Sequence, residues 1–316
     1  MRSARCARGV IALAAVVLGG PCLGVLAGCT SGTAPGEGIQ RESGGVVGSR
    51  FHEGIPYAGD RVLDIHVPSR QGWPNPATVP VVILLHGCCG DRSDLGKLSE
   101  ALARAQLVVF NADWAGLDAD ATFPAAYEDV ACAIDFARQH APEFGGDPER
   151  LVVAGWSDGA MAAAAVAAAP ERFDGQGCLA EKATDAVAPA AVAGIGGFYG
   201  WTAPVAGAYV TPRTSRFFGG GPEEAAENWA AATPYSWLAS APSTLLLAGT
   251  TDPLVDDARR YAEALRRAGR SVRVVAIPPD GDQTLISPRT SEGRRVVAEI
   301  AALGAATTQL TSPHRR

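Results

Sequence analysis

Charged residues are scarce in this sequence. They make up 19% of its 316 residues, and acidic residues outnumber basic ones, so that the formal net charge is −6. A chain that is 47% hydrophobic and sparsely charged can bury a large core, which excludes an intrinsically disordered protein. The acidic balance leaves no basic footprint for a nucleic-acid partner. No internal repeat is visible either, and one sizeable domain is the natural prediction.

A long, uninterrupted apolar run is also lacking. The N-terminal apolar run, residues 9–27, is short for a bilayer span of about 20 residues and is interrupted by glycines and a proline. It follows three arginines and ends in Leu-Ala-Gly-Cys at Cys29, which resembles a bacterial lipobox. The resemblance implies that residues 1–28 are a lipoprotein signal peptide and that a lipid on Cys29 anchors the exported protein to the membrane of the bacterial cell envelope. A transmembrane helix or a plain secretory signal is the alternative.

Only seven cysteines are present, and two of them leave with the signal peptide. Apart from the lipidated Cys29, the mature chain keeps Cys88, Cys89, Cys132 and Cys178. Disulfides are permitted outside the cytoplasm. Cys132 lies in a predicted helix and Cys178 just past another, so we predict that these two pair, although four cysteines allow three complete pairings.

Strand-like and helix-like segments alternate after a flexible tether predicted for residues 29–50. The alternation predicts one α/β domain over residues 51–305, with a mainly parallel sheet and helices on both faces. Residues 306–316 are expected to be a disordered tail. The expected strands are residues 62–67, 79–85, 107–110, 151–154, 190–195, 244–247 and 271–277, and the expected helices are residues 93–105, 121–140, 160–169 and 291–303.

A serine stands between a predicted strand and a predicted helix in the stretch Gly-Trp-Ser-Asp-Gly, residues 155–159. In the GxSxG pattern the serine occupies a sharp, strained turn, and small neighbours let the surrounding chain pack closely. Gly155 and Gly159 supply these small neighbours. The flanking elements therefore favour a nucleophile elbow at Ser157 over an ordinary glycine-rich turn.

Two other loops carry motifs that agree with the elbow. His86 and Gly87 follow one predicted strand, and Asp252 follows another. With the elbow and the aliphatic strand that ends at residue 277, these motifs make residues 57–303 similar to bacterial α/β-hydrolases of the carboxylesterase and feruloyl-esterase-like (BD-FAE-like) kind. The resemblance implies the α/β-hydrolase fold and a serine esterase acting on a small ester substrate.

The resemblance also implies roles for individual residues. Ser157 is the nucleophile, and Asp252 is the acid that orients and stabilises an imidazolium. Backbone N–H groups of Gly87 or Cys88, together with that of Asp158, form an oxyanion hole in which each donor is worth about 10²–10³ in rate. In the alternative interpretation, Asp252 is only an N-terminal acid of the helix that follows it.

The catalytic base of such a site is missing. The family carries a histidine in the loop after the last strand, whereas this sequence has Gln283 at that place, with Asp282 as a doubtful substitute. A glutamine amide is not a useful base, and losing the histidine of a serine protease removes about six decades of rate. The five histidines all lie elsewhere; they are His52, His66, His86, His140 and His314.

Aromatic residues gather in an insertion over residues 198–242, which contains nine of them. In this fold such a segment often caps the acyl pocket, and an apolar cap favours an acyl or aromatic ester over a sugar or a phosphate. Simple packing of an irregular excursion is the alternative.

No cofactor and no metal are expected. The glycine-rich residues 194–200 resemble a dinucleotide loop, but the last glycine comes one position late and the usual acidic partner is not evident. Asp113, Asp118 and Asp120 lack the pattern of a twelve-residue calcium loop.

Two functions are left open. The first is a cell-envelope serine hydrolase of carboxylic esters whose base is unidentified. The second is a catalytically silent lipoprotein of the α/β-hydrolase fold that binds an apolar ligand or a protein partner.

Overall fold

The fold is seen in a computed structural model. It describes residues 42–43, 49–69, 78–88, 90–117, 122–173, 177–180, 188–200, 211–278 and 282–310. The predicted signal peptide, the lipidation site at Cys29, most of the tether and residues 311–316 lie outside these ranges. Within these ranges, no helix combines the length and the apolarity needed to cross a bilayer.

In the described part of the chain, nine strands form one sheet in the order β1-β2-β3-β5-β4-β6-β7-β8-β9. Three neighbouring pairs, β1 with β2, β2 with β3 and β3 with β5, are antiparallel, and all other neighbours are parallel. The strands are β1 (Glu42–Ser43), β2 (Ser49–Ala58), β3 (Arg61–Pro68), β4 (Val79–Leu85), β5 (Val108–Ala112), β6 (Gly146–Trp156), β7 (Ala191–Ile195), β8 (Ser243–Gly249) and β9 (Val272–Ile277). The mainly parallel sheet confirms the predicted α/β architecture.

The central strand β4 shows why the sheet needs helices on both faces. Side chains alternate between the two faces of a strand. Val81, Ile83 and Leu85 belong to one hydrophobic core, whereas Val82 and Leu84 belong to a second one. All five are fully buried. A strand that is apolar on both faces can be stable only in the middle of a three-layer structure.

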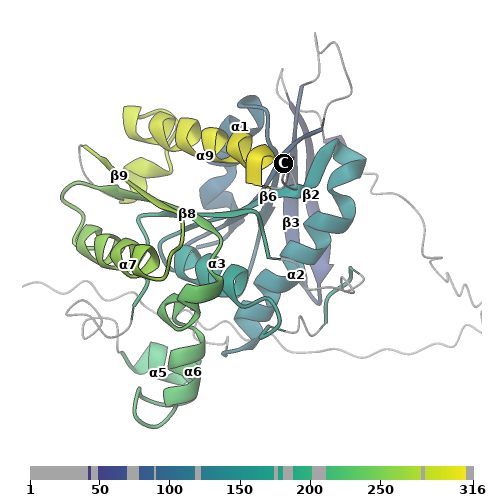
Figure 1. Cartoon of the computed structure of the whole chain (residues 1–316). Helices are drawn as coiled ribbons and strands as arrows, with labels where there is room; N and C mark the ends of the chain where they lie inside the picture. The colour runs from purple at the N-terminus through teal and green to yellow at the C-terminus, as the bar shows by residue number, and fades with distance from the viewer. Residues whose placement is uncertain are drawn as a thin grey trace, which may run out of the picture. The chain divides into compact units, whose positions relative to one another are not determined.

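The helices form the two outer layers (Figure 1). One face of the sheet is covered by α1 and α9, and the other by α2, α3 and α7. The principal helices are α1 (Gly96–Arg104), α2 (Ala125–His140), α3 (Asp158–Ala168), α7 (Val255–Arg267) and α9 (Ser291–Leu310), and the shorter ones are η1 (Arg92–Leu95), η2 (Ala141–Phe144), α5 (Pro212–Phe218), α6 (Ala226–Ala231), η3 (Pro234–Ser240) and α8 (Asp282–Leu285).

Two predicted helix boundaries are wrong. The helix expected from residue 121 begins at Ala125, after Pro124 at the N-cap, because proline has no N–H to continue a helix interior. The last helix does not stop at residue 303 but runs to Leu310, and Thr307 is fully buried. Residues 306–310 are therefore helical rather than part of a disordered tail.

The N-terminal edge of the sheet contains strands that the sequence pattern missed. β1 and the first two residues of β2 come from the segment predicted to be a flexible tether. β1 pairs with β2 in the register Glu42 with His52, and Ser49 at the start of β2 pairs with Pro68 of β3. Strand pairing at a sheet edge depends on main-chain hydrogen bonds, so it needs no run of apolar side chains. The polar composition of this segment therefore gave a wrong prediction for the part that pairs.

The aromatic insertion contributes short helices that pack inward. Phe218 lies between Trp229 and Phe123, at ring distances of 4.2 and 5.9 Å. Phe123 also contacts Tyr127 of α2 at 5.3 Å. These side chains belong to the main core. The described part of the insertion thus favours the packing alternative over a cap; residues 201–210 lie outside the described ranges.

A disulfide joins Cys132 and Cys178, the two cysteines for which pairing was predicted. Cys132 lies in α2, and Cys178 forms an isolated bridge with Ala58 at the end of β2. The bond joins residues 46 positions apart and ties the segment after α3 to helix α2.

Candidate active site

The turn between β6 and α3 presents Ser157. Its backbone has φ 56° and ψ −122°, a conformation that residues with a side chain rarely adopt. The Ser157 N–H donates to the carbonyl of Ile195 at 3.0 Å, which holds the turn against the end of β7. The side chain is half-buried. The strained turn predicted from the GxSxG pattern is therefore present, with the hydroxyl at the carboxyl end of the parallel strands.

Glycines are required on both sides of this serine. A Cβ on Gly155 would lie 2.1 Å from the carbonyl oxygen of Gly159, and a Cβ on Gly159 would lie 2.5 Å from that of His86. Main-chain atoms cannot move aside as the end of a side chain can. The two glycines therefore let the helix start, the strand end and the neighbouring loop approach one another.

The loop after β4 lies directly against the serine. A Cβ on Gly87 would come within 3.0 Å of the Ser157 Cβ and 3.1 Å of the Trp156 ring. The main chain of Gly87 thus lies against the turn of Ser157, and the oxyanion hole that includes it stays a prediction. Cys88 is exposed, and Cys89 lies outside the described residues.

The carboxylate of Asp158 binds one of the predicted oxyanion donors. Its Oδ1 accepts a hydrogen bond from the Cys88 N–H, while its side chain is 1% exposed. Burial raises the pKa of Asp158 to about 6, although the Cys88 N–H and the nearby His86 ring act in the opposite direction. The sequence predicted a role only for the main-chain N–H of Asp158. The acidic side chain at the position after the nucleophile was the signal for this second contact.

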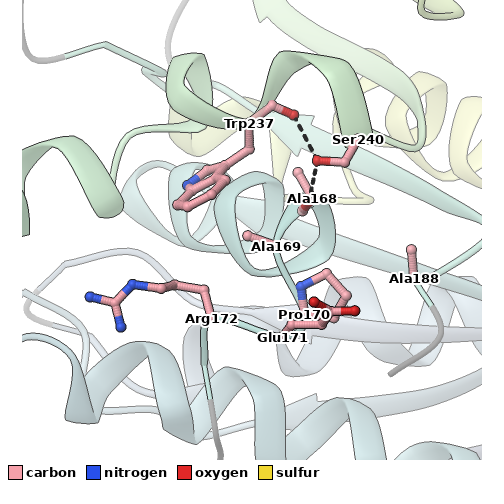
Figure 2. Close-up of a pocket in the computed structure, with 8 residues that line it drawn as sticks. All are labelled: Ala168, Ala169, Pro170, Glu171, Arg172, Ala188, Trp237 and Ser240. Atoms are coloured by element: carbon pink, nitrogen blue, oxygen red, sulfur yellow. Dashed lines mark hydrogen bonds between the residues drawn. The ribbon is translucent and has the colours of Figure 1, made fainter. Parts of the chain in front are cut away.

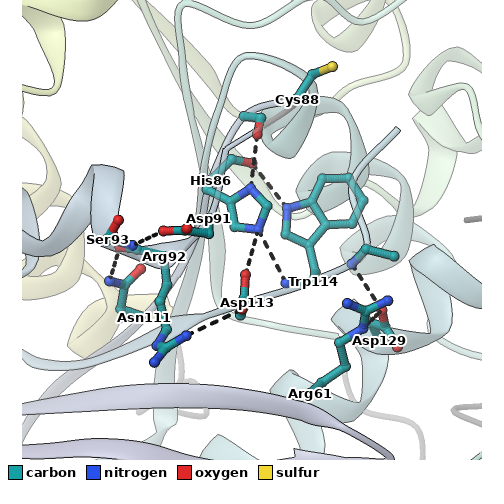
Figure 3. A network of polar contacts seen from close by, with 12 residues as sticks. Arg61, His86, Cys88, Asp91, Arg92, Ser93, Asn111, Asp113, Trp114 and Asp129 are labelled. Atoms are coloured by element: carbon teal, nitrogen blue, oxygen red, sulfur yellow. Dashed lines mark hydrogen bonds and ion pairs between the residues drawn. The ribbon is translucent and has the colours of Figure 1, made fainter. Parts of the chain in front are cut away.

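His86 is held in a polar network on the other side of the same loop (Figure 3). Its Nδ1 lies 2.9 Å from the Gly87 carbonyl, and its Nε2 lies 3.3 Å from both Asp113 Oδ1 and the Trp114 N–H. Burial lowers the pKa of His86, but the bonds with Asp113 and Gly87 outweigh it, so that the pKa is raised. Arg92 bonds to Asp113 as well. Both ring nitrogens are thus engaged away from Ser157, and His86 anchors its turn.

The other histidines in the described residues either lie far from the elbow or contact another side chain. His52 and His66 are on β2 and β3, and β3 is separated from the strand of Ser157 by two intervening strands, or about 14 Å. His140 ends α2, where its Nδ1 contacts Glu143 at 2.7 Å. Among the described side chains, none forms a hydrogen bond with the Ser157 hydroxyl. His314 lies outside the described residues.

Asp252 follows β8, as the acid prediction requires. It is 8% exposed, and its Oδ1 accepts the Leu254 N–H at 2.8 Å in the turn that leads into α7. This contact matches the alternative role at a helix start, and one carboxylate can serve both. β8 stands two strand spacings from β6, roughly 10 Å, so Asp252 and Ser157 follow strands that are separated by β7 alone.

Gln283, the residue predicted at the place of the missing base, lies in α8, which follows the last strand, β9. α8 packs against β8 and α9, so its main chain is at the same end of the sheet as Asp252. Gln283 and Asp282 are in this short helix, but their side chains lie outside the described part of the structure. The assignment of Gln283 to the histidine's place remains a prediction.

A surface hollow of about 570 Å³ lies at the opposite end of α3 (Figure 2). It is lined by Trp237, Ser240, Arg172 and the residues that follow the helix. Because α3 has 11 residues, its two ends are about 16 Å apart. The hollow is therefore separate from Ser157.

Comparisons with known proteins agree with this architecture. A model of the BD-FAE family matches residues 63–264, well over half of the chain. A search of curated protein sequences finds no match.

Solved structures of esterases share the fold. One of two fungal esterases from Rhizomucor miehei is 24% identical with a TM-score of 0.62, over 83% of this chain and 84% of that one. A bacterial heroin esterase is 22% identical with a TM-score of 0.63, over 82% and 84%. Esterase 2 of Thermogutta terrifontis, phosphoramylated by tabun, is 19% identical with a TM-score of 0.63, over 87% and 100%. The family match and the fold together show that this chain is an esterase-like α/β-hydrolase that belongs to the BD-FAE family.

Proposed function

We propose that this protein hydrolyses small carboxylic esters through Ser157 as nucleophile, and that its turnover is slow. The observation that carries the proposal is the strained backbone of Ser157, which holds its hydroxyl at the strand ends beside the Gly87 loop. Structural strain of this kind persists only where the surrounding packing enforces it. The esterases with the same fold support an ester as substrate.

The chemistry follows from the geometry. The Ser157 oxygen attacks the ester carbonyl carbon, and the carbonyl oxygen becomes an oxyanion beside the main-chain N–H groups of the elbow and the Gly87 loop. The alcohol leaves and an acyl-serine forms, which water then hydrolyses to the acid and free serine. The hydroxyl proton must pass to a base in the first step. Since no described side chain contacts the hydroxyl, we expect the first step to be slow.

A fluorophosphonate probe tests the nucleophile. We expect the wild-type protein to be labelled and Ser157→Ala to remain unlabelled, because the probe phosphonylates only a reactive serine. The esterase from Thermogutta terrifontis reacts with an organophosphorus compound in the corresponding fold. The measurement is the labelled fraction over time, with the modified residue located by mass spectrometry of peptides. Equal labelling of the two proteins, or none in either, would show that Ser157 is not the nucleophile.

A second function is favoured by the lack of a base. A catalytically silent protein that keeps the site for an apolar ligand or a protein partner would also have a serine without a hydrogen-bonded acceptor. Hydrolysis of p-nitrophenyl acetate separates the two proposals: slow wild-type turnover above the uncatalysed rate that Ser157→Ala abolishes rules out the silent one.

We also propose that the protein is exported and anchored to the bacterial cell envelope by a lipid on Cys29. The support is the sequence alone, namely the arginines, the short apolar run and the lipobox-like ending. Metabolic labelling with a fatty acid in a bacterial host should mark the wild-type protein and fail with Cys29→Ala. Fatty-acid label retained by the variant, or a wild type released without lipid, would contradict the anchor.

A further inference from the structure

We infer that the Asp158 side chain blocks the oxyanion site, so that Ser157 reacts slowly while this carboxylate is ionised and faster once it is protonated or removed. The inference rests on the proposed function of Ser157. Asp158 would then be a second determinant of the reactivity of Ser157, in addition to the glutamine at position 283.

The first support is the hydrogen bond from the Cys88 N–H to Asp158 Oδ1. Gly87, one residue earlier, lies so close to Ser157 that a Cβ on it would be 3.0 Å from the Ser157 Cβ. The Cys88 N–H thus belongs to the loop that packs against the turn of the nucleophile. An oxyanion hole works because its donors are fixed and unoccupied until charge develops on the substrate. A donor already bound by a carboxylate must be released before it can bind an oxyanion.

The second support is the burial of the charge. Asp158 is 1% exposed, and its Oδ2 has no hydrogen-bond partner among the described residues. An ionised carboxylate in such a place loses its hydration, and this loss outweighs the main-chain N–H groups and the His86 ring that stabilise the charge. It also repels the negative charge that forms on the ester oxygen during attack. The occupied donor and the repulsion act in the same direction. When Asp158 takes up a proton the repulsion disappears, and the neutral carboxyl oxygen holds the Cys88 N–H less strongly than the carboxylate does.

Protonation does more than remove the block. A neutral buried carboxylic acid can itself donate a hydrogen bond to an oxyanion. Since burial raises the pKa of Asp158 to about 6, the neutral form prevails below that pH and the ionised form above it. Ser157 is thus expected to react faster as the pH falls through about 6.

Other titratable groups face Asp158 from the elements around it. They are His86 in the loop after β4, with Asp113 and Arg92 behind it, and Tyr127 on α2. Burial raises the pKa of Tyr127 well above its usual range, so it stays neutral at working pH. The pKa of His86 is raised, in part by the charge of Asp158 itself. Each Asp158 variant therefore also changes the pKa of His86, and the pH profile reports on the two groups together.

The experiment measures the rate of fluorophosphonate labelling of Ser157 between pH 5 and pH 8. At pH 8 we expect Asp158→Ala to be labelled about 10²-fold faster than wild type, which is what one released oxyanion donor supplies. Asp158→Asn should gain less, because its amide oxygen can still accept the Cys88 N–H although the charge is gone. At pH 5 the ratio of Asp158→Ala to wild type should approach one.

Ser157→Ala in the Asp158→Ala background is the control for labelling elsewhere, and thermal unfolding verifies that each variant folds. Asp158→Asn keeps the shape of the side chain and tests the inference if Asp158→Ala is unstable. A residue with only a structural role would not produce a ratio that depends on pH. If wild type is labelled at Ser157 but the ratio is near one at pH 8, or equal at both pH values, the Asp158 inference alone fails. If no protein is labelled at Ser157, the proposed function and the inference both fail.

Discussion

Replacing Gln283 with histidine is expected to raise the kcat/KM for p-nitrophenyl acetate by about 10³-fold. The loss of the histidine from a serine protease costs about six decades, and we expect a histidine placed without other adjustments to recover about half of them. The imidazole would accept the Ser157 proton during attack and return it to the leaving alcohol. Asp252, at the end of the neighbouring strand β8, would stabilise the resulting imidazolium.

Three controls show whether the gain has this origin. Ser157→Ala added to Gln283→His should remove it, and Asp252→Asn added to Gln283→His should remove most of it, since the imidazole then loses its oriented tautomer. Gln283→Ala should leave the wild-type rate unchanged within a few-fold. A gain that survives Ser157→Ala would come from the new imidazole acting alone, and no gain at all would mean that position 283 is not the place of the base.

Changing Gly155 to alanine is expected to lower the free energy of unfolding by at least about 4 kcal/mol, or to prevent folding. The new Cβ would lie 2.1 Å from the carbonyl oxygen of Gly159 and 2.5 Å from the Ala160 nitrogen. These are main-chain atoms of the first turn of α3, so either the helix or β6 must shift. Urea denaturation monitored by circular dichroism measures the change.

Gly96→Ala is the matched control for this substitution. Gly96 has φ −56° in a helical conformation, and a Cβ there meets nothing within 4 Å. Alanine at such a place stabilises a protein by about 0.4–1 kcal/mol through the unfolded state. If Gly155→Ala is as stable as wild type within about 1 kcal/mol, the close packing at the elbow is wrong.

The local patterns that could be predicted from the sequence are those that depend on neighbours along the chain. The apolar run at residues 79–85 predicted a buried strand, because a strand covered on both faces needs apolar side chains throughout. The pattern Gly-Trp-Ser-Asp-Gly predicted the strained serine, because only small flanking residues permit that turn. The disulfide between Cys132 and Cys178 was also predicted, although other pairings were open.

Predictions failed where the deciding contacts were not local. β1 and the start of β2 pair through main-chain groups, which leave no mark in side-chain polarity. The aromatic residues of the insertion could either cap the acyl pocket or pack into the core. Their contacts with Phe123 and Tyr127, which are far away in sequence, favoured packing into the core. Composition carries no information on such a choice.

For the candidate site, the sequence by itself determined which groups are available: a serine on a glycine-flanked turn, an acid after a late strand, and no histidine in the loop after the last one. Only the tertiary structure decided which hydrogen-bond partners the polar groups of the site have. It engaged both nitrogens of His86 with Asp113 and main-chain groups, and it brought the Asp158 carboxylate to the Cys88 N–H, 70 residues away in the chain. The physical reason is that a hydrogen bond depends on distance and direction in space, and those are set by how the strands and helices pack.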